Sequence, residues 1–161
     1  MSRRMISAAV LTTVCCIAAP GAKTQTAKDL VGTWTLVSAD IQRAGYRIQT
    51  FGPNPSGRLL FGSDGRYALI FLRRDLPTIA SHDRTSETPD ESQAIVQGSI
   101  AHFGTYVVDG NALVFHIEGG TFPNWTGADQ RRPFSLIGNE LTYISPGTTG
   151  FPTKVTMRRY E

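Results

Sequence analysis

Short runs rich in β-branched and aromatic residues recur along most of this chain, and Gly, Asn, Asp and Pro separate them. This pattern indicates an all-β protein, because β-branched and aromatic side chains favour strands whereas the separating residues favour turns. The runs that we expect to form strands are 30–38, 45–50, 57–61, 66–72, 100–108, 112–118, 130–137, 141–145 and 154–160. Nine strands are close to the number that closes a small barrel.

The turns between these runs are typical of hairpins. Ser63-Asp64-Gly65, Asp109-Gly110-Asn111 and Gly138-Asn139 each supply residues that tolerate a positive φ. Hairpins join antiparallel neighbours, whereas parallel strands need crossovers of a dozen or more residues. The pattern therefore predicts a single antiparallel up-and-down barrel of about eight or nine strands.

The segment 73–98 departs from the strand pattern. Within it, Thr88-Pro89-Asp90-Glu91 supplies an N-cap, a proline at the first helical position and a glutamate at the third, so we expect a short helix over 89–97. Its clear apolar residues are confined to 94–96, which predicts a helix lying across the barrel with few contacts. It would be either a lid over an open end or a connector that covers the barrel wall.

Residues 1–22 have the pattern of a cleavable signal peptide. Arg3 and Arg4 precede an apolar run over 6–19, which is too short to span a bilayer, and Gly21 or Ala22 fits the cleavage site. The arginine pair also resembles part of a twin-arginine export signal. No later apolar run approaches the roughly 20 residues of a transmembrane helix. We therefore expect a periplasmic or secreted domain over 23–161, without a stable membrane span.

Composition narrows the class of protein further. Both cysteines, Cys15 and Cys16, lie in the predicted leader, so the mature domain would have no disulfide and would depend on its core for stability. The net charge of +3 falls to about +1 once Arg3 and Arg4 are removed. No basic stripe with interleaved aromatic residues is present, and this argues against nucleic acid as a partner.

Several motifs resemble those of a known family. Gly32-Thr33-Trp34 matches the Gly-x-Trp of lipocalins, in which the tryptophan plugs the closed end of the barrel and a basic residue of the last strand packs on it. Arg158 or Arg159 would be that residue. The further matching runs are FGPNPSGRL at 51–59, the hairpin 59–67, and HFGTYVVDGNALVFHIEGGTFPNWTGADQRRPF at 102–134.

With these motifs the chain resembles the lipocalin-like domain family of bacterial and fungal small proteins from about residue 29 to 159. The resemblance implies a calycin-type barrel of about eight strands around an internal cavity. The chain lacks the Thr-Asp-Tyr motif of true lipocalins, and its helix-bearing segment 73–98 is not where lipocalins keep theirs. Most members of the family have no assigned ligand, and some lipocalin-like barrels catalyse cyclisation or isomerisation.

The polar and aromatic residues that could form a binding site lie in the second half of the chain. They are His102, Tyr106, His116, Glu118, Asn124, Trp125, Gln130 and Arg131. In the strand 112–118, alternation puts Val114, His116 and Glu118 on one face and the remaining apolar residues on the other.

Which of these residues meet depends on the register of the hairpin around Asp109, because a slip of one residue turns a strand over. A two-residue turn would pair Val108 with Asn111 and place His102 beside Ile117, so that the two histidines diverge.

A three-residue loop over 109–111 would instead pair Val108 with Ala112. His102 would then lie opposite Glu118 and join His116 and Tyr106 on one face. Such a cluster could transfer protons near neutral pH, or anchor one polar end of a ligand. Alternatively, His116 and Glu118 form only a cross-strand or solvent-facing pair. No close His-x-His spacing supports zinc, and we expect no metal or cofactor.

The stretch 121–127 reads as an irregular link at one rim of the barrel, because Pro123 cannot donate to a ladder. Either Trp125 and Asn124 contact a ligand, or Trp125 packs on Phe122 while Asn124 caps a turn. Gln130 and Arg131 could bind a carboxylate or carbonyl, and strand alternation requires one of Arg131 and Arg132 to face outward.

Three functions remain compatible with the sequence, which has no mature cysteine nucleophile, nucleophile elbow, phosphate loop or dinucleotide fingerprint. The first is an exported protein that binds a small, largely apolar molecule, anchored by His116, Glu118 and their neighbours. The second is an isomerase or cyclase in which His116 or His102 carries a proton. The third is a structural or partner-binding barrel that is filled by its own side chains.

Overall fold

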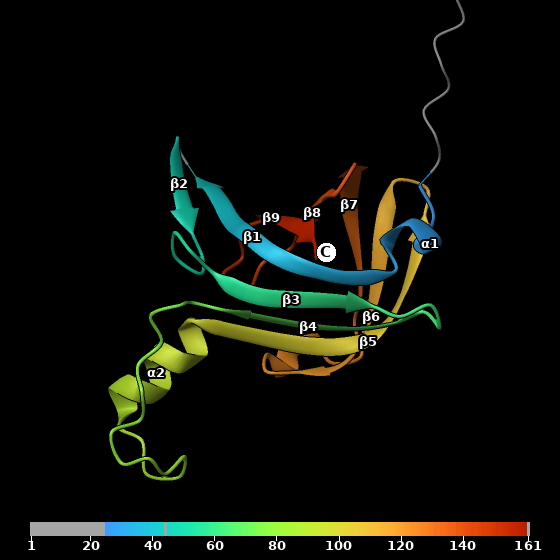
Figure 1. The fold of residues 1–161 in the computed structure, drawn as a ribbon. Helices are drawn as coiled ribbons and strands as arrows, with labels where there is room; N and C mark the ends of the chain where they lie inside the picture. Colours follow the sequence, from blue (N-terminus) through green and yellow to red (C-terminus); the bar gives the residue numbers. More distant parts are fainter. Residues whose placement is uncertain (1–24, 44, 161) are drawn as a thin grey trace, which may run out of the picture.

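The computed structural model describes residues 25–43 and 45–160 (Figure 1). The predicted leader 1–22, with Cys15 and Cys16, lies outside the described residues. The elements are α1 (Ala27–Leu30), β1 (Gly32–Arg43), β2 (Tyr46–Gln49), β3 (Ser56–Phe61), β4 (Arg66–Leu72), α2 (Pro89–Gln97), β5 (Ser99–Asp109), β6 (Ala112–Gly120), the 3-10 helix η1 (Pro123–Trp125), β7 (Asp129–Ile137), β8 (Glu140–Ser145) and β9 (Thr153–Arg159).

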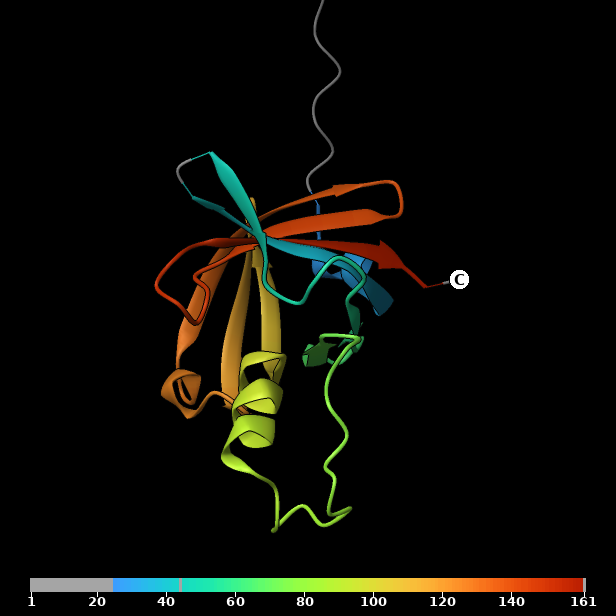
Figure 2. The ribbon, with the colours of Figure 1, turned by 90° about the vertical axis from the view of Figure 1, so that its left-hand side faces the viewer.

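The strands form one antiparallel barrel, as the sequence predicts. Their order is β2-β1-β3-β4-β5-β6-β7-β8-β9, and pairing between β1 and β9 closes the sheet. β2 pairs only with the far end of β1, over Asp40–Arg43, and stands outside the closed ring. Within the described residues, eight strands therefore build the barrel. The remaining strand, β2, extends the hairpin of β1 beyond it (Figures 1 and 2).

Strand alternation fills the interior with large side chains. In β3 the buried residues are Gly57, Leu59 and Phe61, and in β4 they are Tyr67, Leu69 and Phe71. Aromatic rings contact one another between strands: the ring centroids of Phe61 and Tyr106, for example, are 4.5 Å apart, with the rings tilted by 54°. Because each strand turns alternate residues inward, one apolar core extends around the barrel.

One end of the barrel is closed by Trp34 and the short helix α1. Trp34 is fully buried, and its indole Nε1 donates to the carbonyl of Leu30 at 2.8 Å. The guanidinium of Arg159 lies 4.2 Å from the Trp34 ring centroid, which confirms Arg159 as the basic residue that packs on this tryptophan. The sequence pattern placed Leu30 in a strand, but it ends α1 and packs in the core.

The helix α2 spans 89–97, as the sequence predicts, and its capping box forms. The hydroxyl of Thr88 accepts from the backbone N–H of Glu91, and the Glu91 carboxylate accepts from the backbone N–H of Thr88 at 2.8 Å. The expectation that this helix lies across the barrel is wrong: α2 leads away from the barrel, and none of its residues is buried (Figures 1 and 2). In the described part of the chain, no helix is long and apolar enough to cross a membrane.

The hairpin between β5 and β6 adopts neither of the two registers considered above. Its turn is Gly110-Asn111, because Asp109 pairs with Ala112. A bulge between Phe103 and Gly104 then shifts the pairing, and His102 lies opposite Gly120. A Cβ at residue 104 would overlap the carbonyl oxygen of His116, so glycine permits this close approach.

The pairing next to the turn decides which histidine is inside, because it places Tyr106 opposite the buried Phe115 and Thr105 opposite His116. His102 and Tyr106 are buried, whereas His116 and Glu118 are exposed on the outer wall. The cluster of two histidines, a glutamate and a tyrosine that the three-residue loop would have produced does not form. The histidines diverge, as expected for the other register, although the pairing that separates them is different.

Candidate functional site

A cavity lies inside the barrel toward the end opposite α1. The volume of the cavity is about 50 Å³. Together with its mouth, part of which is open to solvent, the empty space is about 410 Å³. The lining residues are Ala39, Thr50, Phe51, Leu69, Phe71, Ile100, His102, Trp125, Arg132, Tyr143, Ser145, Gly147, Thr148, Thr153 and Val155. The interior is thus not completely filled, and the enclosed part has room for a small chemical group or a few waters.

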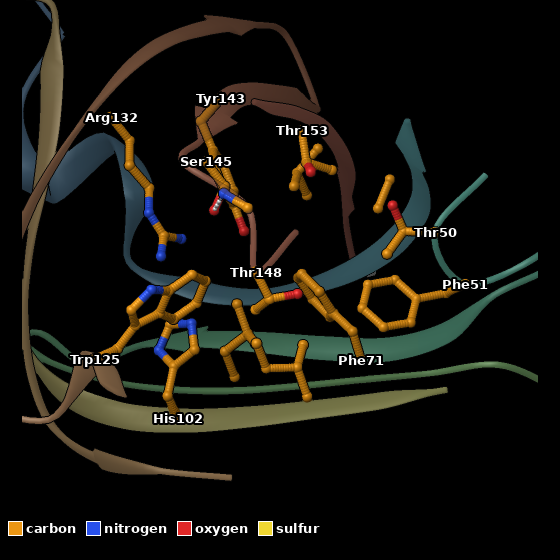
Figure 3. Close-up of a pocket in the computed structure, with 15 residues that line it drawn as sticks. Thr50, Phe51, Phe71, His102, Trp125, Arg132, Tyr143, Ser145, Thr148 and Thr153 are labelled. Atoms are coloured by element: carbon orange, nitrogen blue, oxygen red, sulfur yellow. Dashed lines mark hydrogen bonds between the residues drawn. The ribbon is translucent and has the colours of Figure 1, made fainter. Parts of the chain in front are cut away.

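The lining is divided into a polar part and an apolar part. Arg132, Tyr143 and Ser145 project from β7 and β8 on one side, while the rings of His102 and Trp125 face them from the other (Figure 3). Farther along the cavity, Phe51 and Phe71 lie near Thr148 (Figure 3). A pocket with apolar walls and a few convergent polar groups is the usual form of a small-molecule site.

Arg132 is the most unusual residue of the polar part, because its side chain is a cation buried inside the barrel. The residue is 1% exposed, and its guanidinium donates from Nε and Nη2 to Oε1 of Gln130 at 3.2 and 2.6 Å. Among the described residues it has no carboxylate partner. Burial lowers the pKa of Arg132, since removing a charge from water costs several kcal/mol even after local relaxation.

Aromatic rings surround this guanidinium and offset part of that cost. Its central carbon lies 4.5 Å from the ring centroid of Phe115, 5.4 Å from that of Tyr143 and 5.8 Å from that of Trp125. Each such contact is worth about 0.5–2 kcal/mol, depending on how far water is excluded. Ring contacts do not neutralise the charge, and a net positive charge remains at the polar part of the cavity.

The hydroxyl of Tyr143 is the second unusual group. It is buried, and no group in the described part of the chain lies at both the distance and the angle of a good hydrogen bond to it. Burial raises the pKa of Tyr143 to about 12, although the nearby Arg132 guanidinium acts in the opposite direction. The hydroxyl therefore keeps its proton at neutral pH and can donate it to an acceptor in the cavity.

His102 is held on the opposite side of the cavity by Tyr67. Its Nδ1 lies 2.9 Å from the Tyr67 hydroxyl, and its ring meets the Trp125 ring edge-on at 5.9 Å. Burial, followed by the positive charge of Arg132, lowers the pKa of His102 to about 3. The imidazole is consequently neutral near pH 7, and accepting a proton there is costly.

Trp125 reaches the cavity from the rim. It ends η1, which follows the link expected at 121–127, and its ring packs at 5.4 Å against Phe122. Trp125 packs on Phe122, as one of the two alternatives predicts, and it also lines the cavity, so that contact with a ligand stays a prediction. Asn124 is exposed and does not line it.

The structure brings together only some of the candidate residues. His102 and Trp125 line the cavity, and Gln130 is buried beside it through Arg132. Tyr106 is inside the barrel but away from the cavity, where its hydroxyl donates to the carbonyl of Gly62 at 2.9 Å. The remaining candidates, His116, Glu118, Asn124 and Arg131, are exposed.

Two of the exposed candidates, His116 and Arg131, have partners on the outside of the barrel. Nδ1 of His116 lies 2.7 Å from the carboxylate of Asp129 on the neighbouring strand, and Arg131 forms an ion pair with Asp109. Because His102 faces the interior and His116 the exterior, they cannot act on one ligand together. Within the described residues, no three His, Cys, Asp or Glu side chains gather as they would around a metal ion.

Arg132, Tyr143 and Tyr67 are the main polar residues that the sequence reasoning missed, besides the smaller hydroxyl residues of the lining, Thr50, Ser145, Thr148 and Thr153. Strand alternation carried the signal for Arg132: residues 130 and 132 must share a face, whereas 131 faces the other way. Selecting Gln130 as an interior residue should therefore have selected Arg132 with it and excluded Arg131. Tyr143 alternates in the same way with the buried Leu141 and Ser145.

Comparison with known proteins places the chain in a family. No curated protein matches it. A family model described as a lipocalin-like domain matches residues 31–152, which include every strand from β1 to β8. The match agrees with the closed eight-stranded barrel, its internal cavity and the packing of Arg159 on Trp34. The chain belongs to the family of proteins with a lipocalin-like domain.

Proposed function

We propose that this protein is an exported binding protein that holds a small, largely apolar molecule in the barrel cavity. The observation that carries the proposal is the cavity itself, which is lined by Phe51, Leu69, Phe71, Ile100 and Val155 together with a few polar groups. Apolar walls provide affinity through the hydrophobic effect, and the polar groups orient the bound molecule. The modest enclosed volume favours a ligand whose body extends into the mouth.

The state of the histidines supports binding rather than proton transfer. A general base works best when its pKa lies near the working pH, whereas burial holds the pKa of His102 at about 3. His116, the other proton carrier considered, is on the outer wall and bonded to Asp129. We therefore propose a ligand that leaves the cavity chemically unchanged.

The two tryptophans provide an internal test of cavity binding. Trp125 lines the cavity, whereas Trp34 is buried at the closed end, so an NMR spectrum of ¹⁵N-labelled protein contains one indole N–H signal at the site and one away from it. Titration with 4-phenylbutyrate, 4-phenylbutanamide and longer alkyl homologues should shift the Trp125 signal and leave that of Trp34 in place. If no compound moves the Trp125 signal, or if both signals move together, cavity binding is refuted.

A matched pair of loop variants locates the entrance. Thr148 and Thr149 are neighbouring exposed residues of the loop between β8 and β9, but only Thr148 lines the cavity. Thr148→Phe should narrow the mouth and weaken binding by about tenfold or more, as expected for the loss of one or two kcal/mol. Thr149→Phe should bind as the unchanged protein does. Equal effects of the two substitutions would contradict entry through this mouth.

Export is tested separately. The full chain, expressed in a Gram-negative bacterial host, should be recovered from the periplasm with its N-terminus near Lys23, as measured by intact mass. Replacing Arg3 and Arg4 with Gln should reduce export. Recovery of the uncleaved chain from the cytoplasm would contradict this part of the proposal.

A further inference from the structure

The buried guanidinium of Arg132 lacks a counter-charge within the protein. Its hydrogen-bond acceptor is the neutral amide of Gln130, and none of the residues that line the cavity is an aspartate or glutamate. Asp40, which follows the lining residue Ala39, directs its carboxylate to Arg47 at 2.8 Å. A buried cation normally has an anionic partner, because the charge is otherwise poorly solvated.

The free part of the guanidinium faces the cavity. Gln130 engages Nε and one N–H of Nη2. Within the described part of the chain, the Tyr143 hydroxyl is the other group close enough to interact with the guanidinium, and no carboxylate accepts from the remaining N–H groups. Figure 3 shows the guanidinium directed into the cavity, toward the rings of Trp125 and His102. The buried hydroxyl of Tyr143, which has no well-aligned hydrogen-bond partner in the described residues, adds a further donor beside the guanidinium.

These donors favour one kind of acceptor. A guanidinium presents parallel N–H groups that match the two oxygens of a carboxylate. The polar part contains one cation and two neutral donors, because both His102 and Tyr143 are uncharged at neutral pH. A single negative charge is thus sufficient to neutralise the site, and the apolar residues beyond it suit an apolar chain or ring.

We propose that the cavity binds a small organic monocarboxylic acid, whose carboxylate accepts hydrogen bonds from the guanidinium of Arg132 and the hydroxyl of Tyr143 while its apolar body lies along Phe71 and Phe51 toward the mouth. This inference rests on the proposed function, because it specifies the ligand of the same cavity. Arg132 is the residue that selects the acid, and Gln130 positions its guanidinium.

The experiment compares an acid with its uncharged isostere. Dissociation constants of 4-phenylbutyrate and 4-phenylbutanamide are measured at pH 7 by calorimetry, with the Trp125 indole signal as a check of location. The acid should bind about 30-fold more tightly, as expected for a charge-assisted hydrogen-bonded pair. Inorganic phosphate and sulfate should compete poorly, since they cannot use the apolar wall. Competition by either anion at concentrations below those of the acid would overturn the assignment to a carboxylic acid.

Two neighbouring arginines supply the variant and its control. Arg132→Met should bring the acid and the amide to within about threefold of each other, because the charge is lost while an unbranched apolar side chain still fills most of the space. Arg131→Met removes an exposed arginine next to it in β7 and should preserve the preference for the acid. Persistence of the preference in Arg132→Met, or its loss in Arg131→Met, would overturn the proposal.

The outcomes separate this inference from the proposed function. If both compounds bind equally to the unchanged protein, the acid assignment fails while cavity binding stands. If neither compound moves the Trp125 signal, cavity binding itself fails. Should Arg132→Met lose the circular dichroism of the fold, Tyr143→Phe replaces it, since this variant removes only the orphaned oxygen. Its preference for the acid should fall by about tenfold, and an unchanged preference would count against the proposal.

Discussion

Gln130 and Arg132 project from the same face of β7, and the amide oxygen of Gln130 accepts two hydrogen bonds from the guanidinium of Arg132. The pair fixes the orientation of a buried cation but leaves its charge uncompensated. The stability of the fold and the preference for an acidic ligand therefore both depend on the charge of Arg132, and any change that neutralises the guanidinium alters both.

Gln130→Glu should place a carboxylate against the guanidinium. The empty protein should then be at least as stable as the unchanged one, whereas binding of 4-phenylbutyrate should weaken by about tenfold or more, since the cation is already paired. Urea unfolding and calorimetry at pH 7 measure the two quantities. A variant that binds the acid as tightly as before would show that Arg132 does not contact it.

Removing both partners tests whether the buried charge costs the empty protein stability. Gln130→Leu alone should lower the free energy of unfolding by about 1–3 kcal/mol, because two buried N–H groups lose their acceptor. The double variant Gln130→Leu/Arg132→Met should recover that loss and match or exceed the unchanged protein, since no unpaired charge remains. Urea unfolding of the single and double variants provides the comparison. A double variant less stable than Gln130→Leu would assign Arg132 a structural role instead.

The buried imidazole of His102 should make the protein less stable in weak acid. Its pKa is about 3 in the folded protein and ordinarily 6.5, so below pH 6.5 the unfolded chain takes up a proton that the folded protein refuses. The free energy of unfolding should therefore fall as the pH falls, with a limiting slope of about 1.4 kcal/mol per pH unit from this one group. Between pH 6.5 and 5, where carboxylates contribute little, His102→Gln should reduce the slope measured by urea unfolding. An equal slope in this variant would contradict the buried, neutral imidazole.

Arg159 should stabilise the closed end of the barrel more than its neighbour does. Its guanidinium packs on Trp34 and donates to the carbonyls of Val31 at 2.9 Å and Asp29 at 2.6 Å. Arg159→Met should lower the free energy of unfolding by about 1–3 kcal/mol, whereas Arg158→Met, at an exposed position, should change it by about 0.5 kcal/mol or less. Thermal unfolding of the two variants makes the comparison, and equal losses would contradict this role for Arg159.

The order of the strands and the helix α2 were predictable because local chemistry determines them. Period-two alternation and turn residues mark the strands, and the capping box at Thr88 marks the first turn of α2. The position of α2 relative to the barrel was not predictable, because few apolar residues of the helix pack against the barrel. The single turn α1 was missed although it carries a local signal, the capping box in which the Asp29 carboxylate accepts from the backbone N–H of Thr26 at 2.8 Å.

The polar part of the cavity was harder to predict than the strands, because it depends on pairing between strands and on a buried charge. The bulge at Gly104 changes the register between β5 and β6, and no periodicity in the sequence encodes a bulge. The pairing of His102 with Gly120 therefore became visible only in the folded barrel, whereas alternation already placed His102 on the same face of β5 as Tyr106. Alternation with Gln130 was enough to predict that Arg132 faces the interior. Arginines are rarely buried without a carboxylate partner, however, so the residue type itself argued against this prediction.

A crystal structure of the protein grown with 4-phenylbutyrate tests most directly whether the cavity around Arg132 is a binding site. The carboxylate should lie inside the barrel, with its oxygens within hydrogen-bond distance of the guanidinium of Arg132 and the hydroxyl of Tyr143, and with its ring toward Phe71. A structure at saturating ligand in which the cavity holds only water, or in which the acid binds elsewhere on the barrel, would contradict the account.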